Sequence, residues 1–309
     1  MISGPRILPF MAALFLFASS PAIAQQVADT LFNPRVGMPA YGEKAGPKVL
    51  IDEAHHNYHT MAGRYLTFAR LLQKDGYVVE PQRGRFSRND LDHAKILVIA
   101  NALAEENTTS WTLPTPSAFE ASEIEAVRDW VRDGGSLLLI ADHMPFPGAA
   151  GALAAEFGVA MGNGYVLDID SEGGRMRFAR SDGSLVDHPV TRGRNRSERI
   201  DSIFAFTGQA FRFLDKGEPL MILGRNTKLF MPQAAAQFSQ LTPGMLSGGM
   251  LQGAAITFGK GRVAIFGEAS MFSAQVIGPS RSPMGFNDPS ALQNPQFVLN
   301  VLHWLSGLI

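Results

Sequence analysis

The chain has 309 residues, of which 46% are hydrophobic and 18% charged, with a formal net charge of −1 at pH 7. This near-neutral balance gives no reason to expect a surface for nucleic acid or anionic membranes, and the hydrophobic fraction is sufficient for a core. The sequence contains no cysteine, which excludes disulfides, thiolate metal ligands and a cysteine nucleophile.

The first residues have the composition of an export signal. Arg6 precedes an apolar run over residues 7–17, and Ala22-Ile23-Ala24 supplies the small residues of a cleavage site. This pattern predicts a signal peptide over residues 1–24 and a periplasmic or secreted protein. The run is short for a membrane span, although an uncleaved anchor is the alternative. Cleavage removes one arginine and no acid, which leaves a net charge of −2. No later run is long enough and apolar enough to cross a membrane, so we expect no transmembrane span in the mature chain.

After a Pro- and Gly-rich leader over residues 25–47, strands and helices alternate along the chain. The apolar runs at 48–53, 77–80, 96–101 and 136–140 predict buried strands. Residues 61–74, 118–132 and 148–157 have helical periodicity or composition, and Ser117 is the expected cap of the second helix. Alternation of this kind predicts a doubly wound, mostly parallel sheet in one α/β domain over residues 48–309.

The second half of the chain has a different pattern. Short β-like runs, separated by Gly- and Asp-rich turns, occur at 165–169, 176–179, 203–213, 220–224 and 234–238. A hairpin follows over 254–268, with its turn at Gly259-Lys260-Gly261, and a closing helix over 294–305. These runs predict an antiparallel β extension in the C-terminal half.

Ionisable and polar residues collect where the predicted strands end. Asp52 and Glu53 are followed by His55, His56 and His59, and the strand at 96–101 ends at Asn101. Asp142 and His143 follow the strand at 136–140, and Glu268 and Ser270 follow the hairpin. Four of the seven histidines lie at two of these ends. Since the carboxyl ends of parallel strands meet at one edge of a sheet, we expect these groups to share one rim.

Three interpretations of this rim are open. His55, His59, Asp142 and His143 could bind a divalent metal such as Zn²⁺ or Mn²⁺, which would polarise a substrate oxygen or activate water. Without a metal, His143 could act as a base oriented by Asp52 or Asp142, with Glu268 as the acid. In either case Asp52, Glu53, His56, Asn101 and Ser270 are the expected ligand-binding residues. The third interpretation is structural: these residues cap turns and pair with one another.

Two further features bear on function. Arg192-Gly193-Arg194-Asn195-Arg196-Ser197-Glu198-Arg199 could bind an oxyanion, but its charge pattern favours a solvated loop balanced by Asp187, Glu198 and Asp201. Tyr58, Trp111 and Phe146 are aromatic residues near the expected rim, where they could stack on a sugar.

Five landmarks carry a family resemblance: Ile51-Asp52-Glu53-Ala54-His55, residues 97–101, residues 123–142 with Gly134-Gly135-Ser136-Leu137-Leu138-Leu139-Ile140, residues 259–272, and residues 294–304. In this order the chain resembles the class I glutamine amidotransferase-like superfamily, in its bacterial domain-of-unknown-function branch. That branch is related to ThuA-like, gliding-motility and intraflagellar-transport domains. The resemblance spans residues 48–305 and implies a flavodoxin-like sheet with its functional rim at the carboxyl ends of the strands.

The resemblance also implies what this chain does not do. In amidotransferases the nucleophilic cysteine follows the strand that matches residues 137–140; here Asp142 and His143 take that place, which excludes glutaminase chemistry through a thioester. Several relatives are thought to bind carbohydrate rather than to catalyse. We therefore expect an exported protein that binds a small polar molecule or glycan at the rim, with metal-assisted hydrolysis as an extension of this function. The alternative is a non-catalytic interaction module with a protein partner in a cell-envelope complex.

Overall fold

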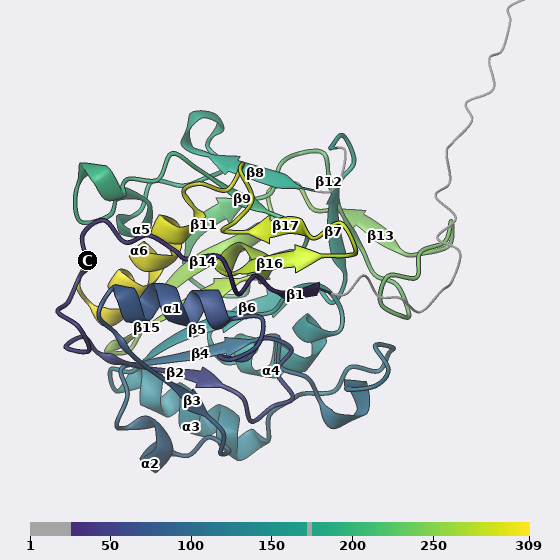
Figure 1. The fold of residues 1–309 in the computed structure, drawn as a ribbon. Coiled ribbons are helices and arrows are strands. Elements are labelled where there is room, and N and C mark those ends of the chain that lie inside the picture. Colours follow the sequence, from purple (N-terminus) through teal and green to yellow (C-terminus); the bar gives the residue numbers. More distant parts are fainter. Residues whose placement is uncertain (1–25, 172–174) are drawn as a thin grey trace, which may run out of the picture.

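The computed structural model of the protein describes residues 26–171 and 175–309; the expected signal peptide, residues 1–24, lies outside the described residues. Among the described residues, the largest sheet has nine strands (Figure 1). Five of them are parallel and neighbours in space, in the order β3 (Val78–Gln82), β2 (Lys48–Asp52), β4 (Ile96–Ala100), β5 (Ser136–Ile140) and β15 (Gly261–Phe266). The prediction of a mixed α/β fold with a parallel core is confirmed.

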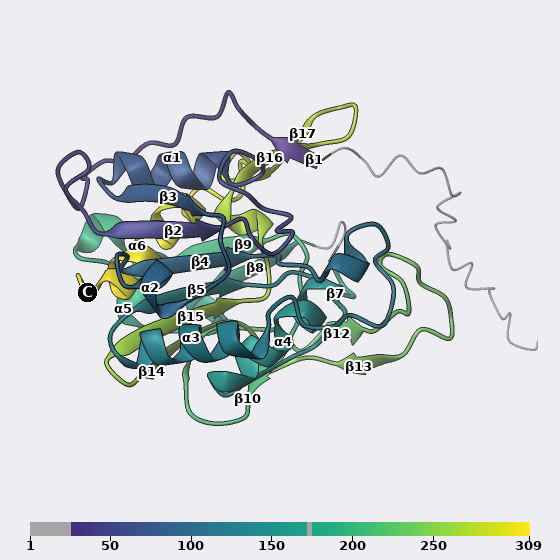
Figure 2. The ribbon, with the colours of Figure 1, turned by 90° about the horizontal axis from the view of Figure 1, so that it is seen from below.

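Helices cover both faces of the parallel strands, which is why β4 and β5 are apolar almost throughout. On one face lie α1 (Leu66–Lys74), α5 (Pro189–Arg192) and α6 (Asn294–Ser306); on the other lie α2 (Arg88–Leu91), α3 (Ala121–Arg132) and α4 (Phe146–Glu156). Figure 2 shows α1 on one side of the sheet and α3 and α4 on the other. Alternate residues of each strand therefore enter two separate cores, as Leu138 and Leu139 do.

The C-terminal half adds antiparallel strands, as predicted. The main sheet continues through β14 (Leu251–Phe258), with β11 (Glu218–Ile222) beside it, to β10 (Phe211–Phe213) and β6 (Val159–Met161). Three smaller sheets complete the fold: β13 (Gly244–Leu246) with β12 (Thr227–Phe230) and β7 (Tyr165–Asp168); β8 (Met176–Ala179) with β9 (Ser202–Ala205); and β1 (Gln26–Ala28) with β16 (Ala274–Ile277) and β17 (Ser282–Gly285). The sheets of β1 and β13 lie toward the carboxyl ends of the parallel strands (Figure 2).

Two strand predictions were wrong. Residues 203–213 do not form one strand, because the chain turns at Gly208, whose φ is +116°, and divides the run between β9 and β10. Residues 234–238 form no strand; Ala234 makes a single bridge to Thr112. Both segments are short, so their conformation depends on the distant strands and loops that pair with them.

Two predicted helices begin later than expected. Residues 61–65 form turns before α1, and α3 begins at Ala121 instead of residue 118. Ser117 is not the cap of α3; the carboxylate of Glu123 instead accepts a hydrogen bond from the N–H of Glu120 (3.0 Å), the residue before the helix.

The leader lies along the surface of the α/β domain. Its first residues pair as β1 with β16, and Arg70 of α1 donates a hydrogen bond to the carbonyl oxygen of Thr30 (2.8 Å). The Asp75 carboxylate accepts another from the N–H of Ala40 (2.8 Å). In the described residues, no helix is both long enough and apolar enough to span a membrane.

Candidate functional site

Three of the predicted strand ends meet through one amide, that of Asn101. Its Oδ1 accepts a hydrogen bond from the N–H of Asp142 (2.9 Å), and its Nδ2 donates to Nδ1 of His59 (3.1 Å). The residue follows β4 in a left-handed conformation (φ +50°), in which its own N–H donates to the carbonyl oxygen of Ile140 (2.9 Å). Asn101 thus links the end of β4 to the end of β5 and to the loop after β2.

His59 is buried and neutral. Because the Asn101 amide donates to Nδ1, the ring proton is on Nε2. This atom lies 3.4 Å from Nε2 of Gln275, and a turn of the Gln275 amide would bring to it the acceptor Oε1, which makes no hydrogen bond within the described chain. Burial, and then the nearby Arg64 and His143, lower the pKa of His59 well below its ordinary value. The ring is therefore a hydrogen-bonding group without charge at neutral pH.

Two carboxyl groups lie beneath this edge. Asp142 is 5% exposed and accepts hydrogen bonds from the N–H of His143 (2.8 Å) and the hydroxyl of Thr207 (3.3 Å). Glu268 is fully buried and accepts from the N–H groups of Ser270 (2.8 Å) and Met271 (2.7 Å). Burial, and then the neighbouring Asp142 carboxylate, raise the pKa of Glu268 well above its ordinary value. The two acids form a buried pair that does not reach the surface.

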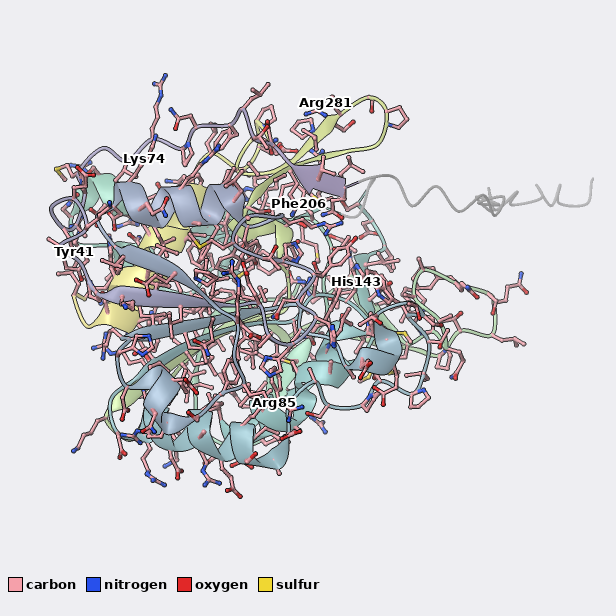
Figure 3. The ribbon with its side chains drawn as sticks, turned by 60° about the horizontal axis from the view of Figure 1, so that its bottom comes forward. Tyr41, Lys74, Arg85, His143, Phe206 and Arg281 are labelled. Atoms are coloured by element: carbon pink, nitrogen blue, oxygen red, sulfur yellow. The ribbon has the colours of Figure 1, made fainter. Side chains whose placement is uncertain are left out.

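His143 is the half-buried member of this group and lies where the parallel strands end (Figure 3). Its Nδ1 lies 2.8 Å from the carbonyl oxygen of Met144, so Nδ1 carries the proton and donates it. The ring stacks on Tyr165, with centroids 4.3 Å apart and planes 13° from parallel. In the described part of the chain, Nε2 makes no hydrogen bond, so a ligand can use it.

Aromatic rings surround His143. Trp111 lies 6.1 Å and Phe146 5.8 Å from its centroid, and Tyr58 lies 5.1 Å from Trp111 and 5.7 Å from Phe146. The three aromatic residues expected near the rim do gather, and Tyr165 joins them. We refer to Tyr58, Trp111, His143, Phe146 and Tyr165 together as the aromatic rim.

His55 belongs to a second, separate group. Its Nδ1 lies 2.9 Å from Oδ1 of Asp52 and its Nε2 lies 3.0 Å from Oε1 of Glu123 on α3, so each ring nitrogen faces a carboxylate. Burial alone would lower the pKa of His55, but the hydrogen bonds and negative charges of Asp52 and Glu123 outweigh it and raise this pKa. The ring packs between Phe86 and Phe119. The Asp52–His55–Glu123 bridge ties the end of β2 to α3 and matches the structural interpretation of this histidine.

The remaining predicted site residues, Glu53, His56 and Ser270, are not part of the aromatic rim. Glu53 accepts hydrogen bonds from the N–H of Met61 (3.0 Å) and from Arg83 (3.2 Å), and His56 is exposed with a φ of +46°. Ser270 supports Glu268 through its N–H.

The four residues expected to bind a metal are not gathered into one cluster. Over residues 26–171 and 175–309, no group of three or more His, Asp or Glu side chains is arranged to hold a metal ion. Metal binding by His55, His59, Asp142 and His143 stays a prediction.

The arginine-rich segment is balanced by the acids expected from the sequence. Arg192 pairs with Asp187, Arg194 with Glu198, and Arg199 with Asp201. These acids pair with three of the four arginines, as predicted, but Glu198 is 3% exposed, so the segment is charge-balanced without being solvated throughout.

Sequence reasoning missed three residues of the site. Tyr165, which stacks on His143, was assigned only to a β-like run, and Glu123 only to a helix. Arg64, which lies over the ring of Tyr58 with its Cζ 3.6 Å from the ring centroid, was not noticed. The one feature of the sequence that could have indicated this contact is that Arg64 lies six residues after Tyr58, in a segment rich in histidine.

Hollows adjoin the edge where the parallel strands end. One of 180 Å³ lies beside His55 and His56, against the loop after β4. One of 410 Å³ lies in the loop between β12 and β13, next to Phe238, whose ring contacts Tyr165. One of 440 Å³ lies beside Arg64.

No protein-family model and no curated protein matches this sequence. The fold is similar to the mmIFT52 N-terminal domain, with a TM-score of 0.58 at 13% identity over 84% of this chain and 97% of that domain. Cytoplasmic protein STM1381 from Salmonella typhimurium LT2 gives a TM-score of 0.47 (16% identity; 84% and 98% covered), and a putative ThuA-like protein from Bacteroides uniformis ATCC 8492 gives 0.46 (14%; 87% and 95%). At these identities the likeness concerns the fold alone. It agrees, at a coarse level, with the resemblance drawn from the sequence.

Proposed function

We propose that the protein is an exported member of the class I glutamine amidotransferase-like superfamily that binds a carbohydrate at its aromatic rim. The order of the five parallel strands, 2-1-3-4-5 when they are numbered among themselves, supports a flavodoxin-like core. In sheets of this type ligands bind at the carboxyl ends of the strands. The likeness to the mmIFT52 domain supports the same fold and says nothing of the ligand.

The observation that carries the proposal is the environment of His143. A half-buried imidazole lies flat on Tyr165, has Trp111 and Phe146 around it, and keeps an unused acceptor at Nε2. Sites for small polar ligands combine aromatic walls with a few fixed polar groups. The apolar faces of a sugar ring would contact the half-buried Tyr58 and Trp111, and a hydroxyl would donate to Nε2 of His143. Phe146 and Tyr165, which are 1% and 7% exposed, would support these side chains from within.

Binding is better supported than hydrolysis. Asp142 and Glu268 are 5% and 0% exposed and are engaged by backbone N–H groups, so a ligand on the aromatic rim would not touch them in this conformation. Their role in the proposal is to hold the end of β5, from which His143 projects. Metal-assisted hydrolysis would need the predicted metal and is kept as a separate, less supported version.

The test is a glycan panel probed with the wild-type protein and with His143→Ala. His93→Ala is the matched control, because His93 is an exposed histidine before β4. Binding to a glycan that falls at least about tenfold in His143→Ala, and is unchanged in His93→Ala, would support the proposal, because a lost charge-free hydrogen bond plus stacking contact is worth about 1–2 kcal/mol. Equal binding by both variants would show that the aromatic rim is not the ligand site.

A second candidate function is favoured by apolar side chains near the β12–β13 loop. Leu241 is 91% exposed, and Phe238, Met245 and Leu246 are also exposed. Exposed apolar groups that lie close together often mark a protein interface. If the protein is instead an interaction module, Leu241→Asp should abolish its cross-linking to an envelope partner, and His143→Ala should not.

A further inference from the structure

Arg64 is a half-buried cation at the border of the aromatic rim. It lies in the turn before α1, with its Cζ 3.6 Å from the centroid of the Tyr58 ring, and its Nη1 donates a hydrogen bond to the carbonyl oxygen of Tyr58 (3.1 Å). Its Nε is buried and has no hydrogen-bond partner within the described ranges. A buried donor left unpaired is unfavourable, so this atom indicates a missing acceptor.

The charge of Arg64 is also left without an anion. Over residues 26–171 and 175–309 it forms no ion pair, whereas Arg180, Arg192 and Arg194 each pair with a carboxylate. Burial lowers the pKa of Arg64, which reflects the cost of holding the cation away from water. The Tyr58 ring compensates only in part, because a cation–π contact is worth about 0.5–2 kcal/mol.

Arg64 lines the hollow of 440 Å³ together with a second arginine. Arg281, in the β16–β17 hairpin, is exposed and makes no ion pair in the described chain; Figure 3 shows it close to β1. The other lining residues are Ala62, Gly63, Thr30 and the three residues of β1, none of them acidic. The carboxylate of nearby Asp29 accepts hydrogen bonds from the N–H groups of Leu31 and Phe32 and from Asn287 instead.

A larger hollow, in the arginine-rich segment, gives a useful contrast. It measures 720 Å³ and is lined by Arg192, Arg196 and Arg199, but two of these three guanidinium groups already pair with aspartates. In the hollow beside Arg64 neither cation is ion-paired within the described chain, and no lining residue is acidic. A further hollow, of 450 Å³, also has two cations outside any ion pair, Arg70 and Lys74, but its lining includes the carboxylate of Glu43.

We propose that the hollow between Arg64 and Arg281 is an oxyanion subsite, and that the glycan bound at the aromatic rim carries a carboxylate, as a uronic acid does. The second part rests on the proposed function. Tyr58 joins the two places: Trp111 and Phe146 contact its ring within the aromatic rim, and the Arg64 guanidinium lies over its face. A guanidinium binds a carboxylate through two parallel hydrogen bonds, which would give Nε of Arg64 its acceptor.

The test compares neutral sugars with their uronic acids. The pairs are glucose with glucuronate, galactose with galacturonate, and mannose with mannuronate. Their affinities are measured by ligand-observed NMR at equal ionic strength. The variants are Arg64→Gln, Arg64→Lys and Arg281→Gln, with Arg212→Gln as the control, because Arg212 is an exposed arginine on β10. Thermal denaturation of each variant verifies folding, and Arg281 is exposed, so its replacement should not disturb the core.

The expected result is that at least one uronate binds about tenfold tighter than its neutral partner, since a charge-assisted pair is worth about 1.5–3 kcal/mol. Arg281→Gln should remove this preference without weakening the neutral sugar. Arg64→Gln should also remove the preference, whatever the loss of its contacts with Tyr58 does to the neutral sugar. Arg64→Lys should keep part of the preference, and Arg212→Gln should keep it all. If uronates and neutral sugars bind equally in the wild type, or if the preference survives in Arg64→Gln, the inference is wrong while carbohydrate binding stands.

A second measurement separates the subsite from the glycan. Inorganic phosphate, compared with chloride at equal ionic strength, should raise the melting temperature of the wild type but not of Arg64→Gln or Arg281→Gln. If phosphate does this and no sugar binds, the oxyanion subsite holds and the glycan proposal fails. If neither phosphate nor any uronate acts through Arg64, the subsite itself is refuted.

Discussion

Replacing Glu268 with glutamine should change how the stability of the protein depends on pH. Glu268 is fully buried next to Asp142, and its pKa is raised well above its ordinary value of 4.5. Between pH 4.5 and the raised pKa, the folded protein keeps a proton that the unfolded chain releases. Raising the pH through this range therefore favours unfolding, by about 1.4 kcal/mol for each pH unit.

Glutamine has nearly the same shape but does not titrate, so Glu268→Gln should lose this part of the pH dependence. Below pH 4.5 the wild type and the variant should differ least, because Glu268 is then protonated in both states. Toward neutral pH the variant should become more stable relative to the wild type, which would appear as a rise of a few degrees in the difference between their melting temperatures.

Thermal denaturation followed by circular dichroism from pH 4 to pH 8 is the appropriate measurement. Glu125→Gln is the control, because Glu125 is an exposed residue of α3. If the difference between wild type and Glu268→Gln is the same at every pH, then the pKa of Glu268 is not raised in the folded protein, and the backbone N–H groups of Ser270 and Met271 offset the effect of burial.

Four other predictions can be tested in the same way. His55→Ala removes the cationic partner of two buried carboxylates, which then keep only neutral hydrogen-bond donors, and should destabilise the protein by about 3 kcal/mol, whereas exposed His56→Ala should stay within about 0.5 kcal/mol; equal melting temperatures would contradict the bridge. Since the pKa of His55 is raised above 6.5, stability should also fall as the pH rises past this value, and His55→Gln should not show that fall. Gly285→Ala should be more destabilising than Gly183→Ala, because both have positive φ but only at Gly285 would a Cβ collide with the carbonyl oxygen of Ser273; denaturant midpoints that shift equally would refute this. Elemental analysis of protein purified without chelator tests the metal prediction: stoichiometric Zn or Mn that is absent from His55→Ala would support it, and no metal with a melting temperature unaffected by EDTA would contradict it.

The parallel half of the fold could be predicted from the sequence because its signals are local. The run Ser136–Ile140 is apolar, follows two glycines and ends in polar residues, and it forms β5 with these bounds. A strand buried on both faces needs little more than such a run. The helix ends were less accurate, because the first turn of α3 is set by a hydrogen bond from Glu120 to Glu123 that the apolar periodicity does not contain.

The antiparallel half was harder to predict for a physical reason. A strand such as β10 is three residues long and exists because β6 and β14 pair with it, and neither partner is its neighbour in sequence. The apolar run that contains it is compatible with one long strand or with two short ones. Pairing partners, not intrinsic preference, decide between the two.

For the site, the sequence predicted where polar groups gather but not how they pair. Asn101, Asp142 and Glu268 meet as expected, because parallel strands bring their carboxyl ends together. The partner of His55, Glu123, lies 68 residues away on a helix, and only the packing of α3 against the sheet brings the two together. The role that we propose for Arg64 likewise depends on the hollow beside it, and no pattern along the chain reveals that hollow.

The apolar character of β4 and β5 has a consequence for how the chain finds its alignment. In both strands nearly every residue could enter either core, so a slip by one position would exchange their sides with little loss of burial. Polar contacts at the strand ends distinguish the native alignment. The hydroxyl of Ser136 donates to the carbonyl oxygen of Leu305 (2.7 Å), and the N–H of Asp142 donates to Oδ1 of Asn101 (2.9 Å). The polar groups beneath the aromatic rim therefore also fix the register of the strands. A substitution made there to alter binding would weaken this register as well.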